Sequence, residues 1–157
     1  MRFKRIGGGL VELAATAIAA MQNHRQLDPG AAEAGGVLLG RLIRDSMDVV
    51  VDRVSLPSPS DKRSRFRFFR AAKPAQGVVD AAWRASSGTS IYLGEWHTHA
   101  EGDPGPSTTD RRDWRRIMKW ARFEQDALFF VIVGTSRIGV WELRRLDSSA
   151  RQLDAMP

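Results

Sequence analysis

Two histidines separated by one residue, His97 and His99, end the mostly apolar segment 91–99. We predict a strand here, in which side chains at i and i+2 point to the same face and both imidazoles aim at one point. After seven intervening residues, Ser107 opens a predicted helix that carries Asp110 in its first turn. The pattern therefore constrains the chain to bring two imidazoles and a carboxylate to one end of a sheet.

Two neutral imidazoles and one carboxylate form the open, three-ligand shell of catalytic zinc. Each part also has an ordinary explanation. The histidines could be half-buried strand residues, and Ser107-x-x-Asp110 is close to a capping box, in which the serine accepts the backbone N–H three residues on. Capping and ligation are compatible, because a helix N-terminus favours an anion. The combination predicts one zinc ion held by His97, His99 and Asp110.

Hydrolysis of an amide also needs a base that is not itself a ligand. Glu33 is the best candidate, because it precedes two glycines, Gly35 and Gly36, that permit close approach at the start of a predicted buried strand. Taken alone, Glu33 could be an exposed turn residue. The competing carboxylates are Glu95, Glu101 and Asp103. The last two lie on a loop expected to be mobile, and the first could orient an imidazole instead.

Composition narrows the class of protein. We expect a single domain over residues 1–157, with a core at about 10–145 and a frayed C-terminal tail. The chain has no cysteine, which excludes thiolate zinc sites and cysteine nucleophiles and fits a reducing compartment, the cytoplasm. A net charge of +6 favours acidic partners without specifying nucleic acid.

Hydrophobic periodicity and turn residues predict an α+β fold. The expected strands are residues 2–6, 36–43, 47–56, 65–69, 91–99, 127–133 and 138–143, and the expected helices are 10–25, 74–86 and 107–123. The N-terminal residues 2–20 also resemble a secretory leader, because basic residues precede an apolar stretch, but a helix of the mature domain explains the same residues. No run approaches the ~18 apolar residues of a membrane span.

Three further features carry weaker expectations. The basic, aromatic run 62–70 either flanks a substrate channel or is an edge strand that its charges keep soluble. His24 is expected to be a solvated cation at the end of the first helix. All five tryptophans are expected in the core: Trp83, Trp96, Trp114, Trp120 and Trp141.

Together, Glu33-x-Gly35-Gly36, His97-x-His99 and Ser107-x-x-Asp110 resemble the motif of the JAMM (MPN-plus) metallopeptidases, which detach ubiquitin or ubiquitin-like proteins from lysines. The resemblance implies a JAMM/MPN, cytidine-deaminase-like fold with a mixed, mostly antiparallel sheet flanked by helices. It also implies that the two histidines and Asp110 bind zinc. Glu33 would take a proton from the attacking water and pass it to the leaving amine, and Ser107 would donate a hydrogen bond to the oxyanion.

The amino-acid sequences of segments 94–99 and 101–104 resemble a narrower bacterial branch of the family, the JAMM deconjugases of anti-phage (CBASS) operons. These deconjugases are encoded beside a fused ubiquitin-activating and ubiquitin-conjugating-like enzyme. This resemblance implies a substrate in which the C-terminus of a nucleotidyltransferase related to cyclic GMP-AMP synthase is linked to a target lysine. An extended tail could reach the metal by adding to a sheet edge. Ala100 replaces a proline usual in the family, so a looser loop is expected.

Several other functions remain as alternatives. A zinc deaminase is nearly excluded, because its motif requires cysteines. A general JAMM peptidase that processes ubiquitin-like proteins fits the same motif. A non-catalytic basic module that binds nucleic acid or a partner is a weaker alternative, since the arginine clusters lack a recognisable recognition helix. A catalytically silent scaffold is disfavoured by the complete set of ligands.

Overall fold

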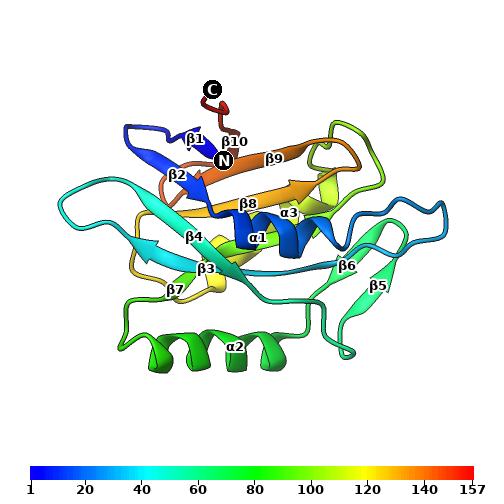
Figure 1. The fold of residues 1–157 in the computed structure, drawn as a ribbon, viewed down its shortest axis with the longest axis horizontal. Helices are drawn as coiled ribbons and strands as arrows, with labels where there is room; N and C mark the ends of the chain where they lie inside the picture. Colours follow the sequence, from blue (N-terminus) through cyan, green and yellow to red (C-terminus); the bar gives the residue numbers. More distant parts are fainter.

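An eight-stranded mixed sheet, with the strand order β1-β2-β4-β3-β7-β8-β9-β10, forms the centre of the structure (Figure 1). The computed structural model describes residues 1–157. Its strands are β1 (Arg2–Lys4), β2 (Leu10–Leu13), β3 (Gly35–Leu42), β4 (Val49–Val54), β5 (Lys62–Ser64), β6 (Arg67–Phe69), β7 (Ile91–Thr98), β8 (Ala127–Val133), β9 (Ile138–Arg144) and β10 (Arg151–Gln152), and its helices are α1 (Ala15–Gln22), α2 (Ala72–Ala85) and α3 (Thr108–Trp120). Only β2 with β4 and β7 with β8 pair in parallel. The expected α+β class with a mostly antiparallel sheet is confirmed.

Helices cover both faces of the sheet (Figure 1). On one face, α1 packs through Ala17 and Met21 against a cluster that includes Phe129 and Val131 of β8. On the other face, Trp114 of α3 stacks on Phe130 at 4.6 Å between ring centroids. The helix α2 packs on this second face as well, over β3 and β7. Because β8 is covered on both sides, all seven of its residues are buried.

A bulge at Gly94 sets the direction of the side chains along β7. Leu93 and Trp96 are three residues apart, yet both pack in the α1-side cluster, which requires one extra residue in the strand. Tyr92 packs on the opposite face, beside α2 and α3. Gly94 has φ +137°, and a Cβ atom there would lie 1.8 Å from the Phe129 carbonyl oxygen. Because of the bulge, Leu93 and Trp96 can both face the α1 side of the sheet while Tyr92 faces α2 and α3.

The helix expected over residues 10–25 is wrong in its first part. Residues 10–13 form β2, which pairs with β1 and β4, and α1 begins only at Ala15. Val11 and Leu13 are fully buried with partly exposed neighbours, so this segment follows a period of two rather than a helical period. Three glycines with positive φ, Gly7 to Gly9, make the turn from β1 into β2.

Other expectations also need correction. The tail after residue 146 is part of the sheet rather than frayed, because β10 pairs with β9 and Leu153 is buried. Three of the five tryptophans are in the core, whereas Trp83 and Trp120 are 52% and 72% exposed. The strand expected at 65–69 is instead a separate hairpin of β5 and β6. None of the helices has the length and hydrophobicity that crossing a membrane requires.

We predict that Gly94→Ala destabilises the protein by at least ~2 kcal/mol, because a Cβ at this positive φ is strained and also meets the backbone of β8. Gly77→Ala is the matched control. Gly77 is exposed in α2 with no atom near its Cβ position, and alanine there should stabilise the helix by about 0.5–1 kcal/mol. Urea unfolding of the two variants measures both effects. Equal stability of Gly94→Ala and the unsubstituted protein would contradict the role of the bulge.

Candidate metal centre

Two imidazoles and one carboxylate converge at the end of β7. The Nε2 atoms of His97 and His99 are 3.0 Å apart. The Oδ1 atom of Asp110 lies 3.3 Å from His97 Nε2, and its Oδ2 atom lies 3.4 Å from His99 Nε2. All three side chains are largely shielded from solvent. The structure thus brings together the three side chains that the sequence selected as ligands, from β7 and from the first turn of α3.

The spacing of these atoms fits a tetrahedral metal ion. Ligand atoms bound at about 2.0–2.1 Å in tetrahedral geometry are about 3.3 Å apart. The three contacts in the cluster, at 3.0, 3.3 and 3.4 Å, agree with that separation. The donor set of nitrogen and oxygen suits zinc and several other divalent ions. The residues present therefore can hold a metal ion without rearrangement.

Backbone pairing between β3 and β7 brings Glu33 to the same point. The Thr98 N–H donates to the Ala34 carbonyl at 2.8 Å, and the Ala34 N–H donates to the Thr98 hydroxyl at 2.9 Å. In this register Glu33 lies opposite His99, with 4.0 Å between Glu33 Oε1 and His99 Nε2. The Glu33 side chain is only 8% exposed. The alternative of an exposed turn residue is therefore wrong.

The electrostatics of the metal-free site raise the pKa of Glu33 and lower that of Asp110. The pKa of Glu33 is raised from 4.5 to about 7, mainly by burial, with the nearby His99 opposing the rise and the Asp110 carboxylate adding to it. Burial also acts to raise the pKa of Asp110, but contacts with His97 and His99 hold that pKa far below its ordinary value. A carboxylate that stays ionised is suited to hold a cation, and a buried carboxyl that titrates near neutrality is suited to proton transfer.

Asp110 has a structural role in addition to any metal binding. Its Oδ2 atom accepts a hydrogen bond from the Ser107 backbone N–H at 2.6 Å, and the Ser107 hydroxyl accepts one from the Asp110 N–H at 3.1 Å. This is a complete capping box at the start of α3. Oδ1 receives no backbone donor and faces His97. Capping and placement beside the imidazoles thus occur in the same side chain.

The β5–β6 hairpin covers the site. The Glu33 N–H donates to the Ser64 carbonyl at 2.8 Å, and the Arg63 guanidinium donates to the Glu33 carbonyl at 2.6 Å. The Phe68 ring lies so close to Gly35 that a Cβ there would be 2.5 Å from it. Glycine at this position therefore permits the close approach that the sequence suggested. The basic run 62–70 lies beside the site, and whether it guides substrate stays a prediction.

The remaining carboxylates near the ligands are engaged elsewhere. Glu95 forms an ion pair with Arg70 at 2.6 Å, so it does not orient an imidazole as the sequence suggested. Glu101 Oε2 is 3.9 Å from His99 Nδ1, but its side chain is 65% exposed. Asp103 pairs with Arg137 at the surface. Glu33, at 8% exposure, is the most deeply buried carboxylate beside the two imidazoles, and it has no arginine partner.

Two features of this region were missed from the sequence. The Arg70–Glu95 ion pair connects the end of β6 to β7. The available signal was the opposite charge of Arg70, at the end of the basic run, and Glu95, two residues before His97. The loop 100–106 is held by backbone hydrogen bonds from Thr135 and Arg137 to residues 101 and 102. The loose loop expected there is not what the structure shows.

His24 also differs from expectation. It is half-buried beside Trp96, with 6.0 Å between ring centroids, and burial lowers its pKa, with Arg63 adding to the effect. It is therefore not a solvated cation. Since it lies outside the cluster of His97, His99 and Asp110, it serves as an internal reference for the role of the other two histidines.

Comparison with known proteins agrees with this geometry. A family model described as prokaryotic homologs of the JAB domain matches residues 14–147. The chain belongs to this family. The resemblance to the JAMM metallopeptidases is therefore confirmed, and with it the enzyme class, a hydrolase of peptide-type bonds.

Individual relatives support the narrower bacterial branch. A CD-NTase/cGAS isopeptidase from Vibrio cholerae is 37% identical over 132 residues, which make up 84% of this chain and 81% of that protein. One of the same name from Pseudomonas aeruginosa is 35% identical over 129 residues, or 82% of this chain and 80% of that protein. The solution structure of a Desulfitobacterium hafniense protein matches with a TM-score of 0.58 at 23% identity, covering 90% of this chain and 88% of that one, which is a likeness of fold alone.

We predict that His97→Ala abolishes metal binding, because two remaining ligands cannot complete the shell. His24→Ala, the change at the third histidine of the chain, should keep about one metal ion per protein. Asp110→Asn should keep the cap and the helix but lose the metal, since an amide oxygen still accepts from the Ser107 N–H. Elemental analysis after dialysis against zinc measures the ratio. Full metal content in His97→Ala would reassign the ligands.

A second prediction concerns the metal-free protein. Because the pKa of Glu33 is raised from 4.5 to about 7 on folding, its contribution to stability is complete below pH 4.5 and falls as the pH rises through 7. Glu33→Gln removes this dependence. The difference in melting temperature between Glu33→Gln and the unsubstituted protein should therefore grow in favour of the variant from pH 5 to pH 8. A difference that stays constant with pH would show that this carboxyl is not perturbed.

Proposed function

We propose that the chain is a zinc-dependent isopeptidase. Its substrate would be a protein whose C-terminus is joined to a target lysine. We propose that this protein is a nucleotidyltransferase related to cyclic GMP-AMP synthase. The chain would act as the deconjugating component of a bacterial anti-phage system, in the cytoplasm, alongside a ubiquitin-activating and ubiquitin-conjugating-like enzyme. The observation that carries the proposal is a buried glutamate, Glu33, held 4.0 Å from a cluster of two imidazoles and a carboxylate.

The arrangement supports hydrolysis because ligands and base are separate groups. His97, His99 and Asp110 would hold the ion, which supplies Lewis acidity and acidifies a water molecule when bound. Glu33 lies beside the cluster, with its backbone fixed by β5 and β7, so its carboxylate would accept the proton of the attacking water. The same carboxyl would then donate that proton to the departing lysine amine. In the metal-free protein the pKa of Glu33 is raised to about 7, mainly by burial, and a group that titrates near neutrality can both accept and donate a proton.

Ser107 would stabilise the oxyanion that forms on the scissile carbonyl. Its Oγ atom accepts a hydrogen bond from the Asp110 N–H, which leaves the hydroxyl proton free to be donated. The residue is exposed at the N-terminus of α3, three positions before Asp110. Removal of one such donor typically lowers turnover ~10²–10³-fold.

Support for the substrate class comes from relatives. The Vibrio cholerae and Pseudomonas aeruginosa proteins, which share over a third of their aligned residues with this chain, are both named CD-NTase/cGAS isopeptidases. All five motif residues, Glu33, His97, His99, Ser107 and Asp110, are present in this chain. A silent scaffold has no need of this complete set. The net charge of +6 alone does not favour nucleic acid over an acidic protein.

We predict that Glu33→Gln keeps the metal but lowers hydrolysis by about 10²–10⁴-fold, the usual contribution of a positioned acid–base group. Asp103→Asn is the matched control, because this carboxylate is exposed near the site and should be dispensable. A peptide whose C-terminal carboxyl is joined to a lysine Nζ, followed by mass spectrometry, measures cleavage. A linear peptide of the same sequence tests bond preference. Unchanged cleavage by Glu33→Gln would remove Glu33 from the mechanism.

A further inference from the structure

A groove leaves the metal centre and runs between α2 and α3. The cleft that contains Glu33, His97 and Asp110 shares Arg70, Arg116 and Ile117 with a hollow of about 710 Å³. That hollow shares Tyr92 and Arg122 with a third one, of about 560 Å³, which reaches the far end of β7. Because neighbouring hollows share lining residues, the three lie in a row along β7, and we treat them as one path.

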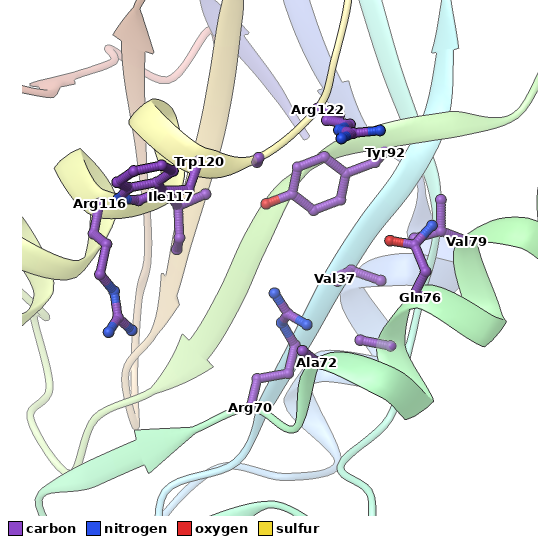
Figure 2. A pocket seen from close by; sticks show the side chains of 12 residues that line it. Val37, Arg70, Ala72, Gln76, Val79, Tyr92, Arg116, Ile117, Trp120 and Arg122 are labelled. Carbon is purple, nitrogen blue, oxygen red and sulfur yellow. The ribbon is translucent and has the colours of Figure 1, made fainter.

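The floor and walls of the central hollow are mainly apolar. Figure 2 shows the Tyr92 ring directed into the space between the two helices, with Val37 beside it, Val79 on α2 and Trp120 on α3. Trp120 is 72% exposed, although burial of its ring would be favourable. Exposed aromatic surface rimmed by polar groups marks interaction sites, and tryptophan, tyrosine and arginine are enriched among the residues that dominate binding there.

The residues that line the central hollow carry positive charge only, although Glu95 lies behind Arg70 and Tyr92. The lining of the hollow contains three arginines and no carboxylate (Figure 2). Arg70 is neutralised by Glu95, but Arg122 is exposed and forms no ion pair, and Arg116 has only Asp113 at 3.9 Å. Further unpaired cations, Arg111 and Arg115, extend along exposed positions of α3. An occupant of complementary chemistry would carry carboxylates together with apolar side chains.

The length of the path matches an extended peptide. β7 has eight residues and spans about 23 Å at about 3.3 Å per residue, so a segment of about seven extended residues would fill the groove. β7 is already paired on both sides, by β3 and β8, so the occupant cannot add to it as a strand. Affinity must come from side-chain pockets and charge rather than from main-chain pairing.

We propose that the α2–α3 groove binds an extended, acidic segment with apolar side chains, which immediately precedes the C-terminal carbonyl of the substrate. This proposal rests on the proposed function, because continuity with the metal centre assigns the segment to the acyl side of the bond. Trp120 and Tyr92 contact its apolar side chains, and Arg122 and Arg116 attract its carboxylates. The groove thus selects which protein tails reach the metal.

The test measures binding without turnover, in zinc-loaded Glu33→Gln protein. Three fluorescent eight-residue peptides with free C-termini share leucine at alternate positions and carry aspartate, asparagine or lysine between them. The aspartate peptide should bind about tenfold more tightly than the asparagine peptide at low salt, and added salt should reduce this difference. Equal binding of the three peptides, or displacement of the aspartate peptide by duplex DNA but not by unlabelled peptide, would overturn the proposal.

Variants of the groove localise the binding. Trp120→Ala should weaken the aspartate peptide about tenfold, and Arg122→Glu should weaken it to a similar degree. Arg44→Glu is the control, because it makes the same charge change at an exposed turn between β3 and β4. Equal weakening by Arg44→Glu and Arg122→Glu would mean attraction by net charge alone, and would contradict a specific groove.

Cleavage assays separate this proposal from the function on which it rests. Peptide binding with the expected variant pattern, but no cleavage of any isopeptide by the unsubstituted zinc-loaded protein, would contradict the proposed function and leave the groove. Cleavage of an acidic-tailed isopeptide with a KM unaffected by Trp120→Ala and Arg122→Glu would contradict the groove and leave the function. A KM raised about tenfold with little change in kcat supports both.

Discussion

The antiparallel register between β3 and β7 is the constraint on which the candidate site depends. Two hydrogen bonds between Ala34 and Thr98 fix this register at the end of the strands. They place Glu33, which immediately precedes β3, opposite His99 at the end of β7. A slip of β3 by one residue would turn Glu33 to the α1-side core, away from the two histidines. The energy of each bond is small, but the geometry they enforce is what assembles the site.

A second constraint connects the sheet to α3. Asp110 completes the capping box of this helix with Ser107 and at the same time faces both imidazoles. The helix N-terminus stabilises its negative charge, as do the imidazoles. The packing of Trp114 on Phe130, one turn further along α3, holds the helix against β8. The position of the carboxylate therefore depends on core packing as well as on local hydrogen bonds.

The site was more predictable from sequence than the surroundings that support it. The spacing of His97, His99 and Asp110 directly encodes a strand, a short loop and a helix start, and the structure has these three elements. Glu33 lies 64 residues from His97 in the chain, so the two glycines after it only suggested its proximity, and the family motif was needed to support that choice. The hairpin over the site and the Arg70–Glu95 ion pair depend on tertiary contacts that local patterns do not encode.

The errors have related physical causes. Residues 10–13 carry apolar side chains at spacings that fit a strand as well as a helix, and pairing with β1 and β4 decides the outcome. Trp83 and Trp120 lie in regular elements, but on helix faces that the rest of the chain leaves largely exposed. A residue within a helix is not thereby a core residue, and these two exposed rings became informative only once the groove between the helices was known.

X-ray absorption of the zinc-loaded protein tests the central claim most directly, because it measures the bound ion rather than its consequences. We predict a four-coordinate shell of nitrogen and oxygen at about 2.0–2.1 Å, with outer scattering from two imidazole rings. Two nitrogens and one oxygen of this shell would come from His97, His99 and Asp110. A six-coordinate shell of oxygen alone, without imidazole scattering, would contradict it.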